Sequence, residues 1–366
     1  MPKRHWRSKL FFAGLVLFLI GAIGVGFTMK SGEMIEKGQP LTKTWDLADS
    51  DISKIAFSSS RDTLIEWKKS TSGKNYVELS GNYSKNDKED IEKLKAASTD
   101  GTSFDLTVPE ENVWFNFGKI YAYGQQKLTV YLTEDTKLEN LQLKSNSGDM
   151  SVSNFKVNSF VSTTSSGELK VNKIEANSVE ASSTSGDIEL ADIKANTSLE
   201  TSSGETTITN LTGNLEVNGN SGDVTASGIK ANNTKIAVES GEIELTNSNI
   251  AKLGTLTSSS GDISTLDTKG KLHVESSSGS IELERITNNL KVKTNSGDVD
   301  VSFVNPAKDI QVFTDSGEID IQLPTDYKAI YEVNTNSGSI KKPTSNTNTE
   351  NRVTVDSSSG DITIEK

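Results

Sequence analysis

Twelve Ser-Gly pairs form a regular repeat in this sequence, and an acidic residue follows ten of them. The pairs recur every 18–22 residues from Ser147-Gly148 to Ser359-Gly360, a spacing that suits one turn repeated in stacked coils. In such a stack the carboxylates form a column with neighbours ~4.8 Å apart. Oxygen ligands suit Ca²⁺. The column therefore predicts calcium sites, carried by Asp187, Glu205, Asp223, Glu242 and Asp262.

Two observations keep a plainer interpretation of the acid column open. Neighbouring carboxylates at this spacing repel by only about 0.9 kcal/mol in water, which an exposed edge tolerates without a cation. Each acid can also accept hydrogen bonds from its own turn. The repeat lacks the two further glycines per turn of calcium-binding nonapeptide rolls. The neighbouring serines have no accompanying base, so they are not predicted to be nucleophiles.

The glycines of the Ser-Gly pairs predict the fold. Glycine adopts a positive φ angle that side chains resist. Short alternating runs such as Leu215–Val217 flank the glycines, and alternation is typical of half-buried strands. The apolar residues that follow the bends should stack in one interior column, formed by Val224, Ile243, Ile263, Ile281 and Val299. The predicted turn residues are Gly148, Gly167, Gly186, Gly204, Gly222, Gly241, Gly261, Gly279, Gly297, Gly317, Gly338 and Gly360.

These patterns predict an all-β protein, a parallel β-solenoid of about twelve coils with 18–22 residues each. At ~4.8 Å per coil the rod would be roughly 55–60 Å long. A period of 18 residues also suits a triangular left-handed coil, so the pattern alone leaves handedness open. We assign residues 141–366 to the solenoid repeats and residues 51–140 to a strand-rich N-terminal cap and first coils, with a short helix within 87–97.

The segment Leu10–Met29 has 20 residues without a charge, enough for a transmembrane helix. Four basic residues precede it, so the positive-inside rule places residues 1–9 in the cytoplasm and the C-terminal ectodomain outside the cell. The sequence therefore predicts a single-pass cell-membrane protein, with residues 30–50 as a juxtamembrane linker. A cleaved signal peptide is the alternative, although its hydrophobic region would be shorter.

One aromatic concentration stands out, formed by Trp114, Phe115, Phe117, Tyr121 and Tyr123. Aromatic side chains supply contact area at low entropic cost, so this group is a candidate binding platform. The alternative is that these rings plug the open end of the solenoid.

Composition excludes several classes of function. The chain carries a net charge of −12, and residues 1–30 hold five basic residues and no acid, so the remainder carries −17. This acidity argues against nucleic acid and favours cationic peptides as partners. There is no cysteine and there are only two histidines, His5 and His273, so thiolate chemistry, cysteine metal sites and histidine clusters are not expected. No cofactor is predicted apart from the Ca²⁺ of the acid column.

Four copies of the bend, Asn146–Asp149, Thr184–Asp187, Asn295–Asp298 and Ser358–Asp361, resemble those of the DUF4097 family of candidate adhesins. The sequence is also similar to LiaG-like proteins of cell-envelope stress loci in Gram-positive bacteria. The resemblance covers roughly residues 51–366. It implies a surface location, a right-handed β-helix and a role in adhesion or envelope stress. It assigns no catalytic residues.

We therefore expect a surface protein that acts by binding and not as an enzyme. An envelope polymer, a cationic peptide or another membrane protein could be the partner. A passive spacer that holds a membrane partner at a set distance is the first alternative. A polysaccharide-active β-helix enzyme is the second. Glu282 and Glu284 could pair for glycoside hydrolysis, but Arg61, Arg285 and Arg352 are too scattered to bind a carboxylated sugar.

Overall fold

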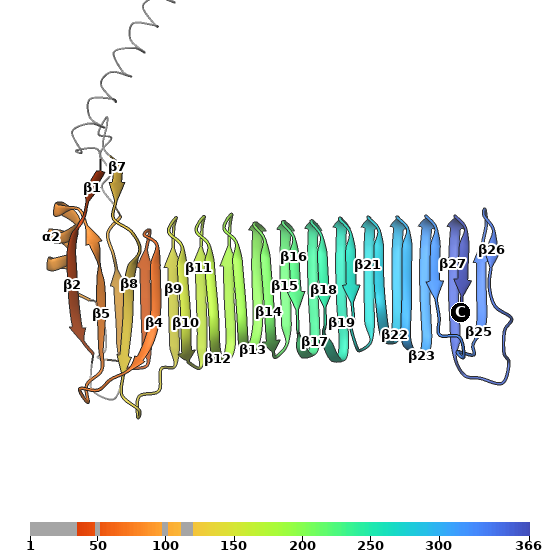
Figure 1. The fold of residues 1–366 in the computed structure, drawn as a ribbon, viewed down its shortest axis with the longest axis horizontal. Helices are drawn as coiled ribbons and strands as arrows, with labels where there is room; N and C mark the ends of the chain where they lie inside the picture. Colours follow the sequence, from red (N-terminus) through yellow and green to blue (C-terminus); the bar gives the residue numbers. More distant parts are fainter. Residues whose placement is uncertain (1–34, 48–51, 97–101, 111–119) are drawn as a thin grey trace, which may run out of the picture.

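The computed structural model describes residues 35–47, 52–96, 102–110 and 120–366. These residues form a long rod of stacked coils, closed at one end by a small cap of strands and a helix (Figure 1). Nearly all strand pairs are parallel. The predicted fold class, an all-β parallel β-solenoid of about twelve coils, is confirmed.

The strands of the rod are, in chain order, β3 (Lys54–Ser59), β4 (Thr63–Lys69), β6 (Ser103–Thr107), β8 (Gln126–Leu132), β9 (Asn140–Ser145), β10 (Met150–Lys156), β11 (Ser159–Thr164), β12 (Leu169–Ser183), β13 (Ile188–Ser203), β14 (Thr206–Thr212), β15 (Leu215–Ser221), β16 (Val224–Ser227), β17 (Lys230–Ser240), β18 (Ile243–Thr246), β19 (Asn249–Ser260), β20 (Ile263–Leu266), β21 (Leu272–Ser278), β22 (Ile281–Ser296), β23 (Val299–Ser316), β24 (Ile319–Gln322), β25 (Ile330–Thr335), β26 (Ile340–Lys341), β27 (Arg352–Ser359) and β28 (Ile362–Glu365). The cap contains β2 (Gln39–Asp46), β5 (Tyr76–Tyr83) and α2 (Lys85–Lys93). A separate two-stranded sheet joins β1 (Ile35–Lys37) to β7 (Ile120–Ala122).

Each regular coil has three straight runs separated by turns. In the coil that contains β13, the runs are 188–191, 193–194 and 197–203. Each run pairs in parallel with the same run of the next coil, so that Ile188 lies beside Thr206 and Thr197 beside Leu215. Because every run between the two end coils has a neighbour on both sides, the backbone groups along the rod are satisfied by ladder hydrogen bonds.

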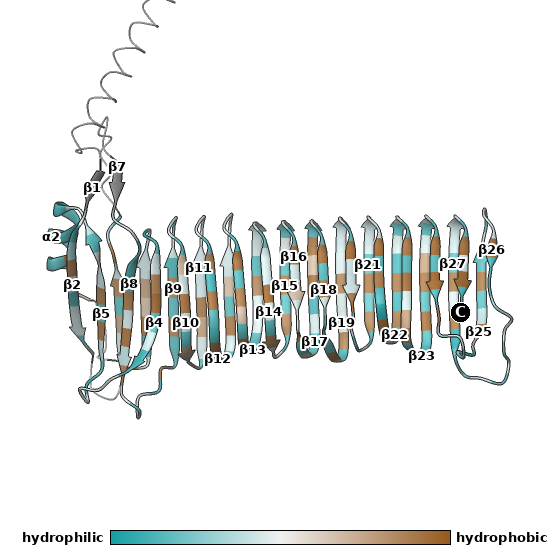
Figure 2. Ribbon diagram, in the orientation of Figure 1, coloured by the Kyte–Doolittle hydropathy of each residue, from teal (hydrophilic) through white to brown (hydrophobic). Residues whose placement is uncertain are grey.

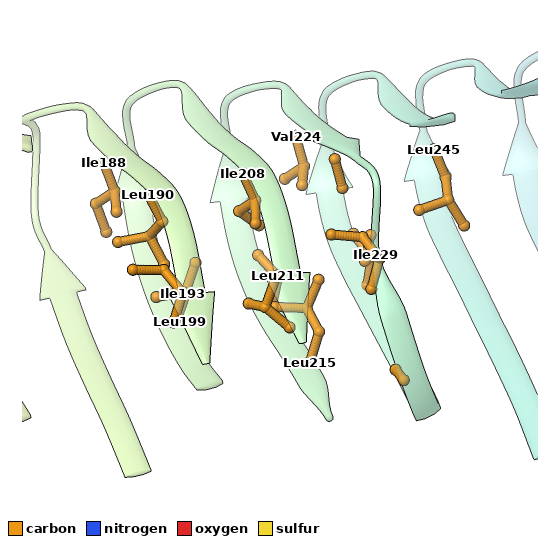
Figure 3. Close-up of a cluster of buried hydrophobic side chains, with 14 of the residues drawn as sticks. Ile188, Leu190, Ile193, Leu199, Ile208, Leu211, Leu215, Val224, Ile229 and Leu245 are labelled. Carbon is orange, nitrogen blue, oxygen red and sulfur yellow. The ribbon is translucent and has the colours of Figure 1, made fainter. Parts of the chain in front are cut away.

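Stacked apolar side chains fill the interior of the rod. Val224, Ile243, Ile263, Ile281 and Val299 lie in direct register in successive coils and are at most 1% exposed, which confirms the predicted column. Apolar and polar residues alternate along the strands (Figure 2), and side chains from several coils point into one continuous core (Figure 3). Each fully buried aliphatic side chain contributes about 1.5–3 kcal/mol of apolar burial.

In eight consecutive coils, from β10 to β22, one corner is a single residue in the left-handed region, with φ between 50° and 72°. Asparagine and aspartate tolerate this conformation better than most residues. Lysine and arginine have no such preference, yet each occupies one corner. The corner residues are Asn154, Lys173, Asp192, Asn210, Gly228, Asn247, Asp267 and Arg285.

The Ser-Gly bends use glycine for a different reason from the one that the sequence suggests. Seven of the twelve glycines have φ between 139° and 158°, including Gly222, but Gly148, Gly167, Gly186, Gly204 and Gly261 do not have a positive φ. All twelve instead lie against the backbone of the neighbouring coil. A Cβ atom on Gly167 would lie 2.1 Å from the carbonyl oxygen of Gly148. The expected positive φ is therefore wrong for five bends, and close stacking is the shared requirement.

The N-terminal end departs from sequence order. The coil formed by β3 and β4 lies between β6 and β8 on one side and β9 and β10 on the other. Beyond it, β5 pairs antiparallel with both β8 and β2. Residues 39–46, which the sequence placed in a linker, therefore form an edge strand of the cap. The side chain of Lys43 donates hydrogen bonds to the carbonyl oxygens of Ile91 and Glu92, 2.8 Å each, at the end of α2.

The C-terminal end shows the same interleaving. Strands β27 and β28 pair with β23 and β24 on one side and with β25 and β26 on the other. Figure 1 shows β25 and β26 at the end of the rod, beyond β27. The loop between β26 and β27 covers the outer edge of β25, where Asn346 N donates to Ala329 O at 2.9 Å and Tyr331 N donates to Ser345 Oγ at 3.0 Å.

The predicted transmembrane helix, residues 10–29, lies outside the described residues. Within the part that the structure describes, no helix has the length and apolar character needed to cross a bilayer.

Candidate functional site

The acid column is built into the backbone ladder of the rod. Asp187 Oδ1 accepts a hydrogen bond from the backbone N–H of Glu205 in the next coil, and Asp223 Oδ1 accepts one from Glu242, both at 2.8 Å. Asp262 Oδ1 likewise accepts from Ser280 N at 2.8 Å. These bonds join neighbouring coils, whereas the sequence suggested bonds within one turn.

Two further observations concern the acid column. The backbone N–H of Ser339 lowers the pKa of Asp361, because this hydrogen bond favours the charged carboxylate. Among the described residues, no group of three or more acidic or histidine side chains has the geometry to hold a metal ion. Calcium binding by the column stays a prediction.

A second group of acids lies on an outer face near the C-terminal end of the rod. Glu282, Asp300 and Asp320 occupy the same position in three consecutive coils. Partial burial and the nearby carboxylates of Asp320 and Glu284 raise the pKa of Asp300 above its usual value. The folded state thus binds a proton on Asp300 more readily than the unfolded chain does, so stability falls as pH rises through the raised pKa.

We expect Asp300→Asn to raise the melting temperature at pH 7 by roughly 1–3 °C, because it removes this repulsion. The gain should shrink at a pH below the ordinary aspartate pKa, where the parent carboxyl is protonated in both states. Melting curves of the parent and the variant at pH 7 and pH 3 test this, with Asp326→Asn as an exposed control. A gain of equal size at both pH values would contradict it.

The predicted aromatic platform falls only partly within the described residues. Trp114, Phe115 and Phe117 lie outside them. Tyr121 belongs to β7, and Tyr123 is buried, with 8% of its surface exposed. A binding role for this group stays a prediction.

A groove of about 810 Å³ opens where the first coils diverge, and we call it the Trp67 groove. Strand β10 turns at Asn154, whose φ is 62°. Strand β4 has no such corner and continues straight along β8 as far as Lys69. The two strands therefore pair only up to Glu66 and Ser153 and then separate. The groove lies where the paired strands β4 and β8 separate from the paired strands β10 and β12.

Apolar side chains form the floor of the Trp67 groove. Leu132, Leu138, Phe155 and Val157 line it and are each at most 6% exposed. Trp67 stands at its wall with 38% of its surface exposed, and it is one of four large apolar side chains among the described residues that are at least 36% exposed. A solvent-exposed indole beside an apolar floor is a common feature of binding sites.

The loop that connects β8 to β9 forms another wall and is held rigidly. The buried side chain of Asn75 accepts a hydrogen bond from Thr133 N at 2.7 Å and donates one to Thr136 Oγ1 at 2.8 Å. The hydroxyls of Thr133 and Thr136 also bond to each other at 2.8 Å. The polar groups of this wall are thus already satisfied, so the groove is preformed.

Charged side chains surround the mouth of the groove. Lys69 pairs with Glu134 at 2.7 Å, and Lys156 pairs with Glu175 at 3.1 Å. Lys137, Lys173 and Glu139 also line the groove. No ion pair of these last three side chains occurs within the described ranges.

Sequence reasoning missed this site because its residues come from separate segments. Trp67 falls in the predicted strand-rich region 51–140, and nothing in the local sequence pattern links it to Phe155 or Leu138. The available signal was the absence of a corner residue after Glu66, where the regular coils place asparagine, aspartate or glycine in most cases.

The solved structures that resemble this chain differ widely from it in sequence. A candidate lipid-binding protein from Parabacteroides distasonis is 16% identical with a TM-score of 0.36, and the alignment covers 78% of this chain and 99% of that one. A candidate adhesin from Parabacteroides merdae is 15% identical with a TM-score of 0.36, covering 78% and 98%. No curated protein matches the chain.

The model of one protein family matches almost all of the rod. The Toastrack DUF4097 model aligns twice, with residues 52–248 and with residues 196–365. The two matches overlap and together extend from the first described coil to the last strand, well over half of the chain. The match agrees with the resemblance in the Ser-Gly-Asp bends. The chain therefore belongs to the Toastrack DUF4097 family.

Proposed function

We propose that this chain is a non-catalytic binding protein of the cell surface that uses the Trp67 groove as its contact site. The observation that carries this proposal is the exposed indole of Trp67 above a buried apolar floor. The rest of the rod presents mainly Ser, Thr, Asn and charged side chains, so the groove is where a ligand gains most from apolar contact.

The remainder of the proposal concerns location. The apolar segment 10–29 would anchor the chain in the cell membrane and place the rod outside the cell. A rigid rod holds its groove at a fixed distance from other elements, which suits adhesion or sensing of the cell envelope. Binding without catalysis is also supported by the acids Asp187, Asp223 and Asp262, which are engaged in ladder hydrogen bonds.

The test is binding of the full chain, held in phospholipid nanodiscs, to isolated cell envelopes. We expect saturable binding that Trp67→Ala weakens by about tenfold or more, as for a central aromatic contact. Leu266→Ala is the matched control, because Leu266 is 36% exposed but lies on β20, far along the rod. Equal binding by both variants would show that the groove is not the contact site.

The passive spacer remains the second candidate, favoured by the regular polar faces of the rod. Absence of saturable binding by the parent chain, with and without Ca²⁺ and a cationic peptide, would support it. Loss of binding on removal of Ca²⁺ would instead support cation binding by the acid column.

A further inference from the structure

We propose that the Trp67 groove binds an anionic amphiphile, a molecule with one alkyl chain and a negatively charged head group. This inference rests on the proposed function, since it names the class of ligand for that same site. The size of the groove is the first argument. About 810 Å³ lies within the range of sites for small molecules, which is roughly 300–1,000 Å³.

The floor of the groove suits an alkyl chain. Leu132, Leu138, Phe155 and Val157 present carbon atoms, and Trp67 adds a flat apolar wall. The hydroxyls of Thr133 and Thr136 are bonded to each other, and Asn75 bonds to the same loop. An extended peptide has polar groups along its whole length. In the floor of the groove the polar groups of the peptide would find no hydrogen-bond partners, and burying them there would cost binding free energy.

The mouth of the groove suits an anionic head group. Four lysines and three glutamates line it, a local excess of positive charge on a chain whose net charge is −12. Two of the lysines are held by Glu134 and Glu175. Lys137 and Lys173 form no ion pair with any other described residue and can extend their ammonium groups towards the head group while their methylenes cover the chain. A cationic peptide would be repelled by the excess of lysines at this mouth.

Photo-crosslinking tests the proposal directly on the full chain in phosphatidylcholine nanodiscs. The probes are a diazirine-bearing dodecanoate and a dodecyl trimethylammonium with the same diazirine, which differ only in the head group. Mass spectrometry of the labelled peptides locates each probe. We expect the carboxylate probe to label segments 132–139 and 154–158 about fivefold more than the cationic probe, since two exposed lysines each contribute a modest attraction.

Two variants separate the head-group contact from general stability. Lys137→Gln combined with Lys173→Asn should reduce carboxylate labelling by about fivefold, while asparagine remains compatible with the left-handed corner, where φ is 55°. Arg285→Asn is the control, because it removes a cation from an equivalent corner with φ of 56° outside the groove. Equal labelling by the two probes, or labelling spread along the rod, would overturn the inference.

The two proposals can fail separately. If Trp67→Ala abolishes envelope binding but no probe labels the groove, the groove binds a ligand of another class and only the amphiphile inference is wrong. If dodecanoate labels the groove while Trp67→Ala leaves envelope binding unchanged, the amphiphile inference stands and the proposed function is wrong.

Discussion

The Gly222→Val variant is expected to lose about 3–5 kcal/mol of stability in the coils around β15 and β16. A Cβ atom at this position would lie 2.2 Å from the carbonyl oxygen of Gly204, and the backbone has φ of 149°. Both the contact and the conformation resist a branched side chain. Because repeat arrays need not unfold in one step, hydrogen exchange of individual segments is the appropriate measurement, supported by the melting temperature.

Two matched variants separate the contact from the backbone conformation. Gly186 lacks a positive φ, but its Cβ would lie 2.0 Å from the carbonyl oxygen of Gly167. Gly73 has φ of 71°, and apart from its two chain neighbours no residue has an atom within 4 Å of its Cβ position. Gly186→Ala should therefore destabilise the rod strongly, whereas Gly73→Asn should change stability little. Similar small effects in both would show that close stacking of the glycines is not required.

The second large effect is expected for Asp87→Ala in the N-terminal cap. The side chains of Arg61 and Asp87 pair at 2.7 Å and are only 10% and 7% exposed, and the guanidinium of Arg61 lies 5.2 Å from the ring centroid of Tyr83. Arg61 occupies the bend beneath Gly148, where the glycine stack ends. Removing the carboxylate from this buried charge pair should cost about 3 kcal/mol or more.

Proteolysis and hydrogen exchange should locate this loss in β2, β5 and α2, because Asp87 connects the helix to the first coil. Asp90→Ala is the control, since Asp90 lies on the same helix but is exposed. Exchange that is accelerated equally along the whole rod would contradict a local role for the pair. So would equal effects of the two substitutions.

The regular part of the rod could be predicted because its information is local and repeated. The alternation around Val224 and the period of the glycines define both the strand faces and the stacking. The reason for glycine could not be predicted, because the Gly148–Gly167 contact joins residues 19 positions apart that only the folded rod brings together. Two of the eight corners could not be predicted, because Lys173 and Arg285 carry no preference for a left-handed conformation.

The order of the coils at the two ends and the position of the Trp67 groove could not be predicted from the repeat spacing. Gly338 and Gly360 continue the spacing of the repeats, so their sequence suggests two coils in order. In the structure Gly360 stacks on Gly317, and Gly338 stacks on Gly360. The repeat spacing likewise does not indicate that β4 lies beside β10. The Trp67 groove forms because β4 pairs with β10 but does not turn with it.

The interleaved ends restrict how the length of such a rod can change. From β9 to β24, each coil is the neighbour of the next one in sequence, so duplicating or deleting one repeat within 140–322 only lengthens or shortens the stack. An extra repeat between β24 and β25 would instead separate strands that must meet across β27 and β28. Both ends therefore behave as fixed units, and variation in rod length should be confined to the middle coils.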